Sequence, residues 1–220
     1  SNASTVNADG LVQVRAEQNT TFGGFVDSRQ ASLAGFSGAN IRHTVHNEVD
    51  AGLGNRVTVN ALDFDMRARN RVTNPVRAGG KRNVDSVSAG LADVPSGGAT
   101  VSVLQNTRAT VAADAVVNLT RPVQGVGLGL LQIEAYNSSV LNQRVNLDSG
   151  GAIAVASAEI AALVTANATV TVGDRARLEV ERGDIDIAAW GEASADLRSS
   201  ATTYGLAGAP SGKADLTYNG

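Results

Sequence analysis

Apolar and polar residues alternate in short runs along the chain, which is the period of a β-strand with one buried face. The first run, residues 10–16, has apolar side chains at Val12, Val14 and Ala16 and polar side chains between them. The same phrase returns at residues 55–61, 129–135 and 183–189. Four copies predict a repeated strand whose polar positions face solvent and whose final alanine lies where the chain turns.

Two further phrases recur between these copies, in the same order each time. A glycine pair leads into small and β-branched residues at 23–26, 97–103 and 150–155, and a strand, polar turn and second strand occupy both 111–119 and 172–180. Repeated segments that follow one another in the same order but at variable spacing are typical of stacked repeats whose insertions lie in loops. We expect two coils of about 20 to 25 residues in each cycle, and roughly six to eight coils in all. Because a tight hairpin cannot join parallel strands, the strands should stack in parallel through longer turns.

The fullest copy of the unit is residues 150–190, and here helix competes with strand over the alanine-rich residues 152–168. Alanine has the highest helix propensity. However, Ile153, Val155, Ile160 and Val164 form no helical stripe, and the glycine pair that opens the segment opens strands elsewhere. The pattern therefore favours strand.

The composition changes the picture of the core. Only 4% of the residues are aromatic and one is Met, whereas 24 are Gly. Such small side chains fill a narrow or layered interior better than a wide one, which favours a slim solenoid and leaves a β-sandwich as the alternative. A net charge of −3 offers no basic field for nucleic acid. The lack of cysteine excludes disulfides and thiolate chemistry, and no apolar run is long enough to insert into a membrane.

Residues 1–3, Ser-Asn-Ala, are typical of the remnant of an expression tag, and residues 4–220 are expected to form a single segment of a longer repeat array. Within it, residues 63–98 are predicted to be a loop insertion, either exposed or forming an arm with its own short strands. The reasons are two prolines and a concentration of basic residues: Arg67, Arg69, Arg71, Arg77, Lys81 and Arg82.

The phrases Gly150-Gly151-Ala152-Ile153, residues 168–174, residues 176–180 and residues 183–189 resemble the repeats of filamentous-haemagglutinin-like exoproteins of Gram-negative bacteria, above all the leukotoxin-type filamentous adhesins. The resemblance implies a right-handed parallel β-helix in a very large secreted protein. It implies an adhesive, structural role on the outer cell surface, with no catalytic residue and no cofactor or metal.

The expected function is therefore to extend and display a surface that contacts a protein or glycan on a host or neighbouring cell. Open strand edges at both ends also predict end-to-end self-association. The rival interpretations are a polysaccharide-cleaving β-helix enzyme and part of a cytotoxic exoprotein.

Three groups of residues are candidates for chemistry. Arg182, Gly183 and Asp184 spell an adhesion tripeptide, although the repeat also needs a turn there. On one outward strand face, Asp63, Asp65 and Arg67 would form a carbohydrate-facing cluster, or else a solvated set of neighbouring charges. The two histidines, His43 and His46, fall on opposite faces of a strand, and no further metal ligand is signalled near them.

Overall fold

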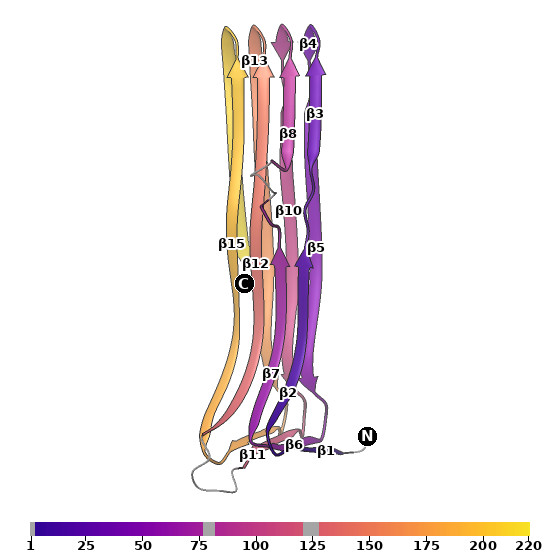
Figure 1. Cartoon of the computed structure of the whole chain (residues 1–220), viewed down its shortest axis with the longest axis vertical. Coiled ribbons are helices and arrows are strands. Elements are labelled where there is room, and N and C mark those ends of the chain that lie inside the picture. The colour runs from indigo at the N-terminus through magenta and orange to yellow at the C-terminus, as the bar shows by residue number, and fades with distance from the viewer. Residues whose placement is uncertain (1–2, 77–81, 121–127) are drawn as a thin grey trace.

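The computed structural model describes residues 3–76, 82–120 and 128–220, and every regular element in these residues is a β-strand. Long strands run side by side along the longest axis of the molecule, and a set of short strands closes one end (Figure 1). The described residues include no helix that could span a membrane. The prediction of an all-β chain is confirmed.

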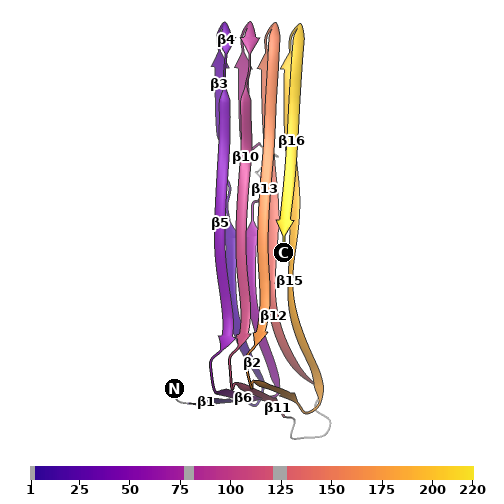
Figure 2. The ribbon, with the colours of Figure 1, turned by 180° about the vertical axis from the view of Figure 1, so that it is seen from behind.

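The strands form three sheets, which we call A, B and C, and every strand pair in them is parallel. Sheet A is the short one at the end of the molecule and contains β1 (Ser4–Asn7), β6 (Val57–Ala61), β11 (Val116–Leu119) and β14 (Arg177–Val180). Sheet B faces the viewer in Figure 1 and contains β2 (Leu11–Thr21), β3 (Val26–Ala31), β7 (Asp63–Thr73), β8 (Val84–Ala89), β12 (Gly129–Gly150) and β15 (Gly183–Tyr204). Sheet C faces the viewer in Figure 2 and contains β4 (Ala34–Gly35), β5 (Gly38–Leu53), β9 (Ala92–Asp93), β10 (Ser96–Val111), β13 (Ile153–Val172) and β16 (Ala207–Asn219).

The chain visits sheets A, B and C in this order four times, and we call each visit a pass. Thr58, Val116 and Arg177 lie side by side in sheet A, so the whole stretch from Thr58 to Val116 makes a single pass, and the stretch from Val116 to Arg177 makes the next. The prediction of two short coils in each cycle is therefore wrong. The strands are much longer than a short coil allows, because β12 and β15 each run for 22 residues without a turn.

The long strands also change the proportions of the molecule. Four strands about 4.8 Å apart span only about 14 Å, whereas the 22 residues of β12 extend for roughly 70 Å. The molecule is therefore longest along its strands and thin in the direction in which the passes stack (Figures 1 and 2).

The recurring phrases are only partly equivalent in space. The copies at Val12, Leu131 and Ile185 do occupy one column of sheet B, but Phe64 fills the second pass of that column. Val57, which the repeated phrase aligned with them, lies in sheet A. The match between 111–119 and 172–180 is confirmed residue by residue, since Val111 pairs with Val172 and Leu119 with Val180.

Residues 63–76 and 82–98, the described part of this stretch, are not a loop insertion. They contain β7, β8, β9 and the start of β10, and Phe64 and Met66 of β7 are fully buried. Arg67, Arg69 and Arg71 occupy outward positions of β7, and this charged face resembles a loop in the sequence. Arg77 and Lys81 lie outside the described residues. The prediction of strand for the alanine-rich segment is confirmed by β13.

The core is a narrow layer between sheets B and C, as the small side chains predicted. Near sheet A it is apolar and receives side chains from all three sheets, among them Phe64, Val111 and Leu119. Farther along, two more apolar clusters join sheets B and C, around Leu141 and Leu147.

A band of buried polar side chains separates the first apolar cluster from the next, and we call it the polar belt. It lies inside the layer, and its members bond to one another across the two sheets: Thr107 donates to Asn137 at 2.5 Å and Asn47 to Asn70 at 3.0 Å. The polar belt consists of Asn47, Asn70, Gln105, Thr107, Asn137 and Ser139, each at most 4% exposed.

The turn between sheets C and A has a left-handed residue in each of three passes, namely Arg56, Asp114 and Arg175, all with φ of 58°. These residues stack above one another, and the Arg175 guanidinium donates to both carboxylate oxygens of Asp114 at 2.6 and 2.9 Å. The hydrogen bond from Arg175 lowers the pKa of Asp114.

Both ends of the stack are open. At the last pass, Ile185 and Ile187 lie in the inward-facing columns of β15, yet they are 48% and 46% exposed because no further pass covers them.

Candidate functional site

The outer face of sheet B carries a group of polar side chains that contact one another across adjacent strands. Residues of odd number in β7 point outward, because Phe64, Met66 and Ala68 between them are fully buried. The register then places Asp65 between Gln13 and Gln132, and Arg67 between Arg15 and Glu134. Three successive strands thus supply one continuous cluster.

Asp65 is the centre of this cluster. It is only 6% exposed, and its carboxylate accepts hydrogen bonds from Arg15 Nη2 at 2.9 Å, Arg67 Nε at 2.5 Å and Gln13 Nε2 at 3.3 Å. The bond to Asp65 in turn raises the pKa of Arg15. Asp65 and Arg67 therefore do lie together, as the sequence predicted.

Asp63 does not join them. Its Oδ1 accepts a hydrogen bond from the backbone nitrogen of Leu130 at 2.9 Å, at the end of the strands. The second carboxylate of the cluster is Glu134, which the sequence did not single out. It is 6% exposed and accepts from Arg69 Nη2 at 3.1 Å. Both buried carboxylates are thus paired with guanidinium groups.

The next outward column of sheet B adds aromatic residues. In register it contains Glu17, Arg69, Tyr136 and Trp190. The Tyr136 and Trp190 rings lie 4.1 Å apart between centroids and tilt by 37°. Burial, and then the hydrogen bond that the Tyr136 hydroxyl donates to Glu192, raises the pKa of Tyr136. Trp190 remains 48% exposed.

A hollow of about 120 Å³ lies beside this column, between it and the next outward column. Tyr136 and Trp190 could have been noticed in the sequence, because each is an aromatic residue at a position where the alternation calls for a polar one. Their contact could not, because they lie far apart in the chain and only the register between β12 and β15 joins them. The residues that line the hollow are Glu17, Asn19, Arg69, Asn70, Arg71 and Tyr136.

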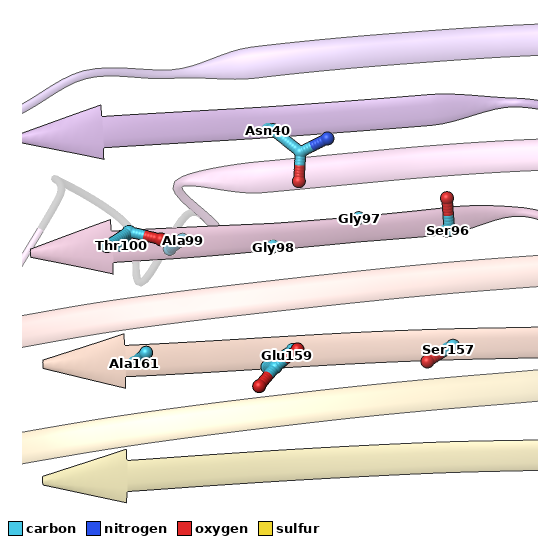
Figure 3. Close-up of a pocket in the computed structure, with 9 residues that line it drawn as sticks. All are labelled: Asn40, Ser96, Gly97, Gly98, Ala99, Thr100, Ser157, Glu159 and Ala161. Atoms are coloured by element: carbon cyan, nitrogen blue, oxygen red, sulfur yellow. The ribbon is translucent and has the colours of Figure 1, made fainter.

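A larger hollow, of about 320 Å³, lies on the outer face of sheet C (Figure 3). It exists because Gly98 has no side chain between Asn40 and Glu159, its neighbours in register. Its lining is small and polar, and no aromatic ring takes part. Lys213 lies 3.8 Å from the Glu159 carboxylate, so the one acidic group of the hollow has a cation beside it.

The tripeptide Arg182, Gly183 and Asp184 is exposed and forms the turn from β14 into β15. Its backbone is tied to the previous pass, since the carbonyl of Arg182 accepts from the nitrogen of Gly129 at 2.8 Å. Gly183 has φ of 143°, and a Cβ there would lie 1.8 Å from the Gly129 oxygen. The turn therefore requires glycine, and an adhesive role for the tripeptide stays a prediction.

The histidines point to opposite faces of β5, as predicted. His43 faces inward and packs against Phe22, with 4.9 Å between the ring centroids, and its pKa is lowered by burial. His46 is exposed, and its Nε2 lies 3.6 Å from Glu48. Within residues 3–76, 82–120 and 128–220, no three His, Cys, Asp or Glu side chains are placed to hold a metal ion.

Comparisons of the chain with known protein families, with characterised proteins and with solved structures find no match, so the fold and the outer face of sheet B carry the functional argument.

Proposed function

We propose that the chain is a segment of a large secreted or surface-displayed bacterial exoprotein, folded as a right-handed parallel β-helix. Its role is to extend and display an adhesive surface toward a host or neighbouring cell. The partner is a surface protein or glycan of that cell, and the site of action is outside a Gram-negative-type bacterium.

The observation that carries this proposal is the register of the passes. Val14, Met66, Ile133 and Ile187 form one unbroken column across four strands of sheet B, and the columns of sheets A and C continue in the same way. Each pass contacts chiefly its neighbours, as in repeat proteins that build extended surfaces. Because parallel ladders join every pass to the next, the stack suits a stiff spacer.

The open ends support self-association of the stack. If the fourth pass of one copy met the first pass of another in the existing register, Ile187 would lie over Val14 and Asp215 over Arg42. Apolar columns would continue inside, and opposite charges would meet outside. Unpaired strand edges are templates for such pairing.

A polysaccharide-cleaving enzyme, the main alternative, would need a carboxylate free to exchange a proton with substrate. Asp65 and Glu134 are instead held by Arg15, Arg67 and Arg69.

The proposal can be tested with beads coated with the purified chain. We expect them to adhere to cultured epithelial cells or to bacteria more than beads coated with the urea-unfolded chain. Equal adhesion of both beads on both kinds of cell would overturn the adhesive role. Release of reducing ends from pectin or xylan by the chain in solution would favour the enzyme instead.

A further inference from the structure

We propose that the outer face of sheet B binds a neutral hexopyranose unit of a glycan, on a platform made by Tyr136 and Trp190 and in the adjoining hollow beside Arg71. This inference rests on the proposed function, because it names the ligand class that the displayed surface would recognise.

The aromatic pair supplies the apolar part of the site. Trp190 is the one tryptophan of the chain and lies at an outward position of β15, the edge strand of sheet B, where it is half-exposed. Its indole is held against Tyr136, whose hydroxyl is fixed by Glu192. A rigid, half-exposed ring face offers apolar contact area at small entropic cost, and suits the C–H face of a sugar ring.

The hollow supplies hydrogen-bonding groups that the fold does not use. Arg71 is exposed and has no hydrogen-bond or ion-pair partner among the described residues. The Nε of Arg69, also at the hollow, is buried and without a partner. A guanidinium presents several N–H donors in a fixed fork, which suits a pair of neighbouring hydroxyl oxygens. Glu17 and Asn19 add acceptors on the opposite side.

The charges of this face select a neutral ligand. In the two outward columns that form the site, Arg69 and Arg71 are matched by the carboxylates of Glu17 and Glu192, so the formal charges balance. An anionic polymer would meet these carboxylates, whereas a hydroxyl-rich neutral ligand can donate to them and accept from the arginines. The four strands span about 14 Å, so more than one sugar unit can lie across them.

The test uses the fluorescence of the single tryptophan. The probes are cellotetraose, mannotetraose and a galactose-based tetrasaccharide as neutral ligands, and a heparin tetrasaccharide as the anionic one. We expect at least one neutral probe to shift the emission of Trp190 in a saturable way, and heparin to bind at least ten-fold more weakly. Saturation-transfer NMR detects the bound probe without using tryptophan fluorescence, so it can also measure binding to the Trp190→Ala variant.

Arg71→Ala should weaken the binding of that probe at least ten-fold, and Trp190→Ala should remove its NMR signal. Phe36→Ala is the matched control, because Phe36 is 73% exposed and lies on the path between β4 and β5, away from this face. Circular dichroism checks that each variant folds. No saturable change with any neutral probe, unaltered binding by both variants, or a preference for heparin would overturn the site.

The bead assay separates this site from the proposed function. Suppose that beads coated with the parent chain and beads coated with the Trp190→Ala variant adhere equally, and both more than beads coated with the unfolded chain, while no neutral probe binds. The sugar site is then wrong and the adhesive role stands. If a neutral probe binds through Arg71 and Trp190 but the beads do not adhere, the site stands and the adhesive role is wrong.

Discussion

One substitution, Gln→Leu, can be compared at two fully buried positions with different expected results: Gln105 in the polar belt and Gln143 outside it. Gln105 is fully bonded: its Nε2 donates to the carbonyl oxygens of Asn70 at 3.1 Å and Ser138 at 3.2 Å, and its Oε1 accepts from Ser139 at 2.6 Å. Gln143 is also fully buried, but its Nε2 makes one bond of 3.3 Å to Asn74 and its Oε1 has no partner.

Gln105→Leu keeps a similar volume but leaves the Ser139 hydroxyl without its acceptor and two carbonyls with one donor fewer. An orphaned buried polar group costs about 1 to 3 kcal/mol, so the free energy of unfolding should fall by about 2 to 4 kcal/mol. Gln143→Leu loses one long bond, worth about 0.5 to 1.5 kcal/mol, and removes an orphan acceptor whose burial costs about 1 to 3 kcal/mol. Asn74 Oδ1 still accepts from the nitrogen of Asn142 at 3.2 Å. This variant should be unchanged or about 1 kcal/mol more stable.

Equilibrium unfolding in urea measures both variants against the parent chain, and equal m-values would show that the same surface is exposed in each. We expect the two variants to differ by at least about 2 kcal/mol, or roughly thirty-fold in the folding equilibrium. A difference within about 0.5 kcal/mol, or the reverse order, would refute the reasoning that bonding, and not mere burial, decides the effect of these amides.

Three further predictions concern other parts of the fold. Because burial lowers the pKa of His43, its contribution to the free energy of unfolding should be complete above pH 6.5 and should decrease as the pH falls below that value. In urea unfolding at a series of pH values, His43→Gln should flatten this dependence, whereas His46→Gln should leave it unchanged. Arg56→Gly should raise the free energy of unfolding by about 0.5 to 1 kcal/mol, because it removes a non-glycine residue from a left-handed conformation. Asp114→Gly, at the same turn position, should gain less or lose stability because it also removes the ion pair with Arg175. The midpoints of thermal unfolding show the order of the two variants. Ile187→Lys should abolish concentration-dependent association in light scattering, since it places a charge at the open end; unchanged association would exclude end-to-end pairing through this edge.

The strands themselves could be predicted because alternation depends only on which face of a strand is buried. The number of residues in a pass could not be predicted from the sequence. The repeated runs that contain Val12 and Val57 alternate equally well, although the two strands belong to different sheets. Phe64 is the residue that pairs with Val12 in sheet B. The charged residues near it in the sequence, Asp63, Asp65 and Arg67, face outward, and a run of such residues resembles a loop.

The candidate site was predictable only in part, for the same reason. Asp65 and Arg67 are two positions apart on one strand, so their proximity follows from the sequence. Trp190 meets Tyr136 only through the register between β12 and β15. That register is set by the inward columns of the whole pass.

The way in which the passes differ in length suggests how such a chain can change during evolution. Leu131 pairs with Phe64 and Val145 with Val84, so the chain from Phe64 to Val84 is longer than the unbroken part of β12 that lies beside it. The extra residues lie between β7 and β8, and the register with β12 is kept on both sides of them, whereas a single residue inserted within a strand would turn every later side chain to the wrong face. Descendants of this sequence can therefore gain or lose residues freely at the junctions, and can gain whole passes by duplication. Inside the strands, substitution is the only tolerated change.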